Sequence, residues 1–265
     1  MTDKKHMKHL LDGFNPTVPF NALADIFEKQ KKFASKWTNF DNREDINYYR
    51  KWVDDYSWCI VDEISEVINW LPWKHWKDYT GCVIDIREVR FELIDILHFV
   101  VNICLLSDVT QEDLQEHCSA KGSDIKSLMR SVKATFIQTT GEDLPLDDEQ
   151  YLCSFTKEYL GKINRIISTM HLKHETHTVQ EASNKLVWRK SIESKKDSTD
   201  AVTRFRTNVV KPGIMNVFTN LLVLFQLWSM TANDVWVYYA AKNKENYDRQ
   251  ERGYKEVLVE LELNV

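Results

Sequence analysis

The amino-acid sequence predicts an all-α fold, a helical bundle with a rigid and a mobile lobe around a central cleft. Apolar residues recur with helical periodicity along most of the chain, and only seven Gly and five Pro occur in 265 residues. Because a many-stranded sheet needs frequent turn residues, this scarcity favours long helices. A hydrophobic content of 43% with 12% aromatic residues indicates a folded core. The length fits one large domain or two modest ones.

Composition also narrows the partners and the compartment. A net charge of −5 gives no electrostatic footprint for a polyanion such as DNA. The five cysteines are scattered, odd in number and without a C-x-x-C motif, which indicates reduced thiols. Residues 1–10 contain no apolar signal core, and no apolar run of roughly 18 residues occurs. We therefore expect an intracellular protein, cytoplasmic or nuclear, that binds neither nucleic acid nor membrane.

The first predicted helix begins at Asn21 and runs to about Trp37. Its apolar stripe contains Leu23, Ile26, Phe27, Phe33, Ala34 and Trp37, and Gln30 falls within that stripe. Gln30 is open to two interpretations. It is either a core-edge side chain satisfied by backbone, or an amide that faces a polar ligand. An amide carries donors and an acceptor, as the edge of a nucleobase does.

The second predicted helix, from about Ile46 to Leu71, carries the first acidic pair. Glu63 and Glu66 are spaced i, i+3 and should project from one face. We expect both on the buried stripe, which consists of Trp52, Tyr56, Cys59, Ile60, Val67 and Trp70. Pro72 ends the helix. In the aromatic and basic loop that follows, residues 73–77, the tryptophans either close the core or offer a ring to a planar ligand.

The third predicted helix, from about Asp85 to Leu106, is apolar except for one narrow face. That face carries Glu88, Glu92, Asp95, His98 and Asn102. Two buried carboxylates about 5 Å apart repel by about 3 kcal/mol at an effective dielectric constant near 20, and desolvation adds to that cost. A divalent cation would reverse the balance, and hard oxygen ligands suit Mg²⁺ or Mn²⁺. The sequence thus predicts a metal site on Glu63, Glu66, Glu92 and Asp95.

The rest of the chain divides into a connector and a second helical region within one catalytic unit spanning 1–265. Residues 21–119 hold the helices with the acidic site, and 120–150 are a polar connector or insertion. Residues 151–265 form the second lobe, with helices at 151–172 and 209–228 separated by a charged loop at 190–200. Thr110 with Asp113, and Thr231 with Asp234, are helix-start signals.

The last helix carries one continuous polar stripe, which is either a solvated face or a source of positive charge for a phosphate chain. The stripe consists of Tyr239, Lys242, Asn243, Asn246, Arg249, Gln250 and Gly253.

The pairs E-x-x-E and E-x-x-D, 25 residues apart, resemble the metal motif of the all-α nucleoside triphosphate pyrophosphohydrolases. Within that group the chain resembles the dimeric dUTPases. The resemblance rests on Ala22–Gln30, on Asp62–Glu66 with Asn69, Trp70 and the W-K-x-W-K string of 73–77, on Glu92–Phe99, and on the Lys242–Tyr254 string. It extends from about Ala22 to Tyr254, whereas 120–150 and 190–200 carry no motif that we can name and look like insertions.

The resemblance implies a Mg²⁺-dependent homodimer that hydrolyses dUTP and dUDP to dUMP, releasing pyrophosphate or phosphate. Such an enzyme limits uracil incorporation into DNA and supplies dUMP for thymidylate synthesis. It further implies that a water attacks phosphorus while Glu63, or alternatively Glu66, takes its proton. Gln30, Trp76, His98 and Asn102 would form the base pocket. Lys242 and Arg249 would hold phosphate oxygens, while Tyr239, Asn243 and Asn246 would line the path of the sugar and phosphates.

Three alternatives remain open on sequence grounds. A related pyrophosphohydrolase acting on another deoxynucleotide such as dCTP would keep the same acidic pairs. A di-iron carboxylate bundle uses acid-x-x-His pairs like Asp95-x-x-His98, but it needs a second one, and Glu66-x-x-Asn69 does not supply it. A helical scaffold without chemistry would leave the buried carboxylates unexplained.

Overall fold

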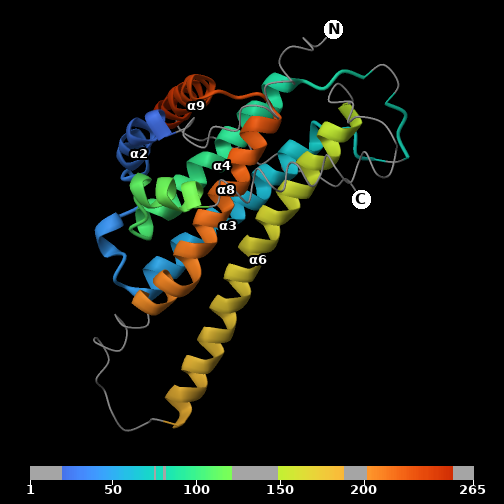
Figure 1. The fold of residues 1–265 in the computed structure, drawn as a ribbon. Helices are drawn as coiled ribbons and strands as arrows, with labels where there is room; N and C mark the ends of the chain where they lie inside the picture. The colour runs from blue at the N-terminus through green and yellow to red at the C-terminus, as the bar shows by residue number, and fades with distance from the viewer. Residues whose placement is uncertain (1–19, 75, 80–81, 121–148, 188–201, 253–265) are drawn as a thin grey trace, which may run out of the picture.

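The computed structural model describes residues 20–74, 76–79, 82–120, 149–187 and 202–252, in which helices joined by turns and loops occur and no strand does (Figure 1). The predicted all-α class is therefore confirmed. The elements are α2 (Phe20–Ala34), η1 (Phe40–Asn42), α3 (Ile46–Asn69), α4 (Ile86–Leu106), a helix at Gln111–Ala120, α6 (Glu149–Val187), η2 (Arg206–Val210), α8 (Lys211–Leu227) and α9 (Ala232–Arg252).

The centre of the bundle is α4, which packs along α3 and against α8, while α8 in turn packs against α6. Buried side chains occur on nearly every side of α4, among them Val89, Leu93, Ile96, Val100 and Ile103, each with no exposed surface. A helix that is apolar all round must be covered by neighbours, which explains its central place. Three polar side chains on α4, those of Glu92, His98 and Asn102, are therefore buried inside protein.

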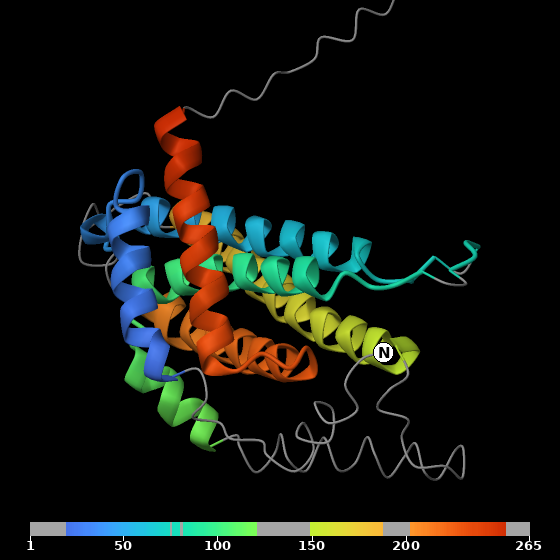
Figure 2. The same ribbon diagram turned by 90° about the horizontal axis from the view of Figure 1, so that it is seen from above.

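Helices α2 and α9 pack on each other and on α4, so they cover one side of the bundle (Figure 2). At their far ends, Lys36 Nζ donates to Gln250 Oε1 at 2.6 Å and lies 4.2 Å from the ring centroid of Tyr247. Phe33 meets the same Tyr247 ring edge-on. An early and a late segment of the chain are thus joined over the polar face of α4.

The most apolar stretch, Val202–Leu227, is long and apolar enough to cross a membrane by length and composition alone. In this structure more than half of it is buried, and α8 packs against α4 and α6. It is a core helix of the bundle.

Side-chain caps fix where four of the described helices start. Asp45 accepts from the backbone N–H groups of Asn47 and Tyr48, and Asp85 does the same at the start of α4. At the start of α9, Thr231 and Asp234 exchange hydrogen bonds, and Thr110 with Asp113 forms the same box. A cap of this kind is worth about 1 kcal/mol. Both predicted capping boxes are confirmed.

Some predicted boundaries were wrong. The first helix ends at Ala34, so Trp37 lies beyond it and is 40% exposed. Helix α6 runs from Glu149 to Val187 and not from 151 to 172. Beyond Leu172 the sequence loses its apolar stripe, so hydrophobic periodicity could not predict that extension. Most of the predicted connector, 121–148, and the charged loop at 190–200 lie outside the described residues.

An ionic cluster around Asp108 joins three segments near the C-terminal end of α4. Asp108 has a positive φ of 54°. Its carboxylate accepts from Arg43 at 2.7 Å and from Arg206 at 3.2 Å, and its backbone carbonyl accepts from Lys211 Nζ at 2.9 Å. Arg206 also reaches Glu44 Oε1 at 3.0 Å. The cluster fixes the start of α8 against the corner that follows α4.

Candidate active site

Three of the four predicted metal ligands converge between α3 and α4. One carboxylate oxygen each from Glu63, Glu92 and Asp95 lies within 4.8 Å of the others. The two helices pack side by side, and the i, i+3 spacing places Glu92 and Asp95 on the α4 face that meets Glu63. Glu92 is only 7% exposed, while Glu63 and Asp95 are half-buried.

The cluster is short of positive charge. Burial raises the pKa of Glu63 to about 8, helped by the charges of Asp95, Glu66 and Glu92. Burial likewise raises the pKa values of Glu92 and Asp95, although the hydrogen bond from Trp70 Nε1 to Glu92 Oε1 at 3.2 Å lowers that of Glu92. Hard oxygen donors that repel one another at this spacing fit a divalent cation such as Mg²⁺ or Mn²⁺.

Glu66 lies at the rim of the cluster. The sequence interpretation that both glutamates share the buried stripe of α3 was wrong for Glu66, which is exposed and outside the 4.8 Å group. Three residues turn an α-helix by about 300°, so Glu66 is rotated by about 60° from Glu63, towards solvent. Its charge still raises the pKa values of Glu63 and Glu92.

Lys242 on α9 supplies the cation nearest to the acids. Its Nζ lies 2.5 Å from Asp95 Oδ2, and both side chains are 14% exposed. Burial opposes its charge, but the pairing with Asp95 raises the pKa of Lys242, so the ammonium stays protonated. Its charge also lowers the pKa values of Glu63 and Glu92. Lys242 is thus a counter-ion shared by all three acids.

A buried network of side-chain amides lies about two turns further along α4, at Asn102. Gln30 Nε2 donates to Asn102 Oδ1 at 3.0 Å, and Tyr239 OH donates to Gln30 Oε1 at 3.0 Å. Asn243 Nδ2 then donates to Tyr239 OH at 3.4 Å. All four side chains are less than 10% exposed. The chain of donors fixes the orientation of both amides, so the Nδ2 group of Asn102 is not used within the network.

His98 lies on α4 between the acid cluster and the amide network. Its Nδ1 lies 2.9 Å from the Ile94 carbonyl oxygen and 3.6 Å from Asp95 Oδ1, so Nδ1 carries the proton. The ring stacks on Tyr239 with centroids 4.6 Å apart. Burial lowers the pKa of His98 to about 4, which keeps the ring neutral at physiological pH. Its Nε2 is therefore a buried acceptor, and it has no hydrogen-bond partner among the described residues.

The other predicted substrate-binding residues lie away from this centre. Arg249 is half-exposed and pairs with Glu245 at 2.5 Å, although its charge lowers the pKa of Asp95. Asn246 is half-buried on α9. Trp76 lies on the loop after α3, 64% exposed and edge-on to Trp73, outside the buried network. Tyr239, expected along the sugar and phosphate path, instead belongs to the amide network.

Trp70 is a site residue to which the sequence assigned no individual role. A tryptophan indole donates one hydrogen bond, and this one holds Glu92. The sequence feature that could have identified Trp70 as a site residue is its position seven residues after Glu63, which is two helical turns along the same face of α3.

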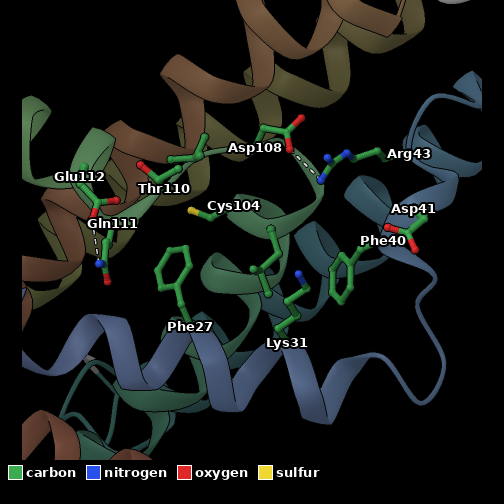
Figure 3. Close-up of a pocket in the computed structure, with 12 residues that line it drawn as sticks. Phe27, Lys31, Phe40, Asp41, Arg43, Cys104, Asp108, Thr110, Gln111 and Glu112 are labelled. Atoms are coloured by element: carbon green, nitrogen blue, oxygen red, sulfur yellow. Dashed lines mark hydrogen bonds and ion pairs between the residues drawn. The ribbon is translucent and has the colours of Figure 1, made fainter.

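A cavity of about 450 Å³ lies elsewhere, between α2 and the corner after α4 (Figure 3). Phe27 and Lys31 line one side, and Thr110 and Glu112 line the other. None of the predicted site residues lines it. The acid cluster and the amide network therefore define a separate site on the face of α4 that α2 and α9 cover.

An all-helical bundle that brings carboxylates from two adjacent helices beside a buried amide network can hold a divalent cation next to a polar ligand. The family model described as dUTPase matches residues 22–155 and 155–254. The chain therefore belongs to the all-α dUTPase family, and its activity at the family level is the hydrolysis of dUTP. Neither a curated protein nor a solved structure matches the chain.

The raised pKa of Glu63 predicts how the stability of the metal-free protein depends on pH. An unfolded glutamate titrates near 4.5, whereas folded Glu63 titrates near 8, so the folded state binds the extra proton between these values. The stabilisation is complete below the lower value and is lost as pH rises through the higher one. With EDTA present, we expect Tm to fall from about pH 5 to about pH 8 and to level off above that range.

Glu63→Gln should flatten that fall, because it removes the titrating group. Thermal melts of both proteins across this range test the prediction. A wild-type Tm that rises with pH, or an equally steep fall in the variant, would contradict it.

Proposed function

We propose that this chain is a Mg²⁺-dependent dUTP diphosphatase, with Mn²⁺ as a substitute, which also accepts dUDP and releases dUMP with pyrophosphate or phosphate. The observation that carries the proposal is the convergence of Glu63, Glu92 and Asp95 within 4.8 Å, one helical turn from a buried acceptor on His98. Family membership supplies the substrate, and the carboxylates supply the ligands for the cation.

Glu63, Glu92 and Asp95 would hold the cation, with Glu66 at the rim. When bound, such a cation neutralises phosphate charge and makes water more acidic. Glu63 is the best candidate for the general base, because burial and three neighbouring carboxylates make it the stronger proton acceptor. Glu66 is the alternative. Lys242 and Arg249 are the cations closest to the path of the phosphate chain, and Asn243 and Asn246 follow it along α9.

The hydrogen-bonding pattern supports uracil as the base. His98 Nε2 offers a lone pair, and Asn102 Nδ2 offers protons, because Gln30 already occupies the Asn102 oxygen. Uracil presents the complement, a ring N–H beside a carbonyl oxygen. Cytosine presents a ring lone pair beside an amino group, which would place acceptor against acceptor and donor against donor. Buried polar groups left unpaired in this way give strong discrimination. This favours dUTP over the dCTP alternative.

The di-iron alternative is not supported. The place of its second histidine is taken by Asn69, which is exposed at the end of α3. His98 directs its protonated nitrogen to a backbone carbonyl.

A nucleotide panel tests the proposal. Purified protein should release dUMP from dUTP and dUDP with Mg²⁺ or Mn²⁺ present and stop in EDTA. Turnover of dCTP should be lower by about 10²-fold or more. Equal rates with dCTP, or undiminished release in EDTA, would overturn it.

We further propose that the enzyme acts as an intracellular homodimer, which limits uracil in DNA and supplies dUMP for thymidylate synthesis. Light scattering after gel filtration tests the dimer, and a single-chain mass at micromolar concentration would contradict it.

A further inference from the structure

The Lys242 ammonium lies where it competes with a cation for the acid cluster. Its Nζ forms an ion pair with Asp95 Oδ2 at 2.5 Å. Asp95 is also one of the three carboxylates that would bind the cation. Its charge acts on Glu63 and Glu92 as well. A divalent ion bound by the same carboxylates would lie close to a like charge in a partly buried setting, where repulsion is weakly screened.

A neighbouring aromatic ring also contacts the ammonium while it is paired with Asp95, and this contact does not depend on that pairing. The Phe91 ring centroid lies 5.6 Å from Nζ, within the range of a cation–π contact. Lys242 is on α9, which packs on α4. A modest change in the side chain would separate Nζ from Asp95 while keeping it beside the path of the phosphate chain.

We propose that Lys242 is a place-holding cation, which neutralises the acids in the metal-free enzyme and leaves Asp95 when a divalent ion binds. The released ammonium is then free to pair with a phosphate oxygen of the nucleotide. Metal and side chain therefore compete, whereas metal and nucleotide assist each other. This inference rests on the metal site proposed above, and it assigns Lys242 a positioning role in addition to phosphate binding.

Mn²⁺ binding in the absence of nucleotide tests the competition. Lys242→Met keeps most of the aliphatic stem and removes the charge, so it should bind Mn²⁺ about tenfold more tightly than wild type in calorimetric titration. Lys244→Met is the matched control, because Lys244 is an exposed cation on the same helix and its loss should leave Mn²⁺ affinity unchanged. Unchanged or weaker binding by Lys242→Met would overturn the inference. If wild type binds no Mn²⁺, the proposed metal site fails as well.

Chemical labelling of the wild-type protein gives an independent result even if the variant does not fold. Lysine methylation, read by mass spectrometry at each site, should be slow at Lys242 in EDTA and several-fold faster with Mg²⁺ alone. Lys244 serves as the internal reference. Equal labelling of Lys242 in both conditions would show that the ammonium does not leave Asp95.

Discussion

Glu63→Gln is expected to lower kcat for dUTP by about 10³-fold, the range in which general bases contribute. The change is isosteric and removes one of several mutually repelling carboxylates, so the protein should fold. In the metal-free state the variant should be at least as stable as wild type above neutral pH, because burial penalises the charge that it removes.

The measurement is initial-rate release of dUMP at saturating dUTP and Mg²⁺, with Glu28→Gln as the matched control. Glu28 is an exposed glutamate on α2, away from the cluster, and its variant should keep the wild-type rate. If Glu63→Gln retains a rate near wild type while Glu66→Gln loses it, the base is Glu66. That outcome would mean that the rim glutamate turns inward when substrate binds.

Asn102→Ala is expected to have the second largest effect, on selectivity. It removes the donor proposed for a uracil carbonyl and leaves Gln30 Nε2 without its acceptor in a buried site. We expect kcat/KM for dUTP to fall by about 10²-fold, with a loss of about 1–3 kcal/mol in the free energy of unfolding. Turnover of dCTP should not fall in proportion, since the variant removes the donor that opposes the cytosine amino group.

The ratio of kcat/KM values for dUTP and dCTP distinguishes a role of Asn102 in base recognition from simple destabilisation, which would lower both values together. Asn47→Ala is the control, because Asn47 is an exposed amide in the first turn of α3. A proportional loss for dUTP and dCTP would contradict the assignment of Asn102 to base recognition.

The bundle was predictable because its signals are local. Apolar periodicity located α2, α3, α4 and α8, a polar stripe located α9, and side-chain caps fixed the starts of α3, α4 and α9. The i, i+3 spacing likewise predicted that Glu92 and Asp95 share a face of α4. Which acid from α3 joins them depends on how that helix is rotated against α4, and a spacing of three residues does not determine that rotation. Glu63 therefore meets the cluster, while Glu66 lies at its rim.

Other parts of the site depend on contacts between distant segments. Tyr239 reaches Gln30 across 209 residues, and Lys242 pairs with Asp95, which is also more than a hundred residues away. A polar stripe on α9 showed that these residues share a helix face, but not which ligand each would meet. Trp76 was assigned to the base pocket from its place in a familiar string, and with 64% of it exposed on the loop after α3 that role stays a prediction.

The pairing of α2 with α9 over α4 has a consequence for how this enzyme matures during synthesis. Gln30 leaves the ribosome early, but its partner Tyr239 is translated more than two hundred residues later, together with Lys242. A nascent chain that has completed α3 and α4 already holds the three acids, yet it lacks both the closure of the base pocket and the lysine beside them. Ribosome-bound intermediates should therefore be unable to capture nucleotide until α9 has emerged from the exit tunnel.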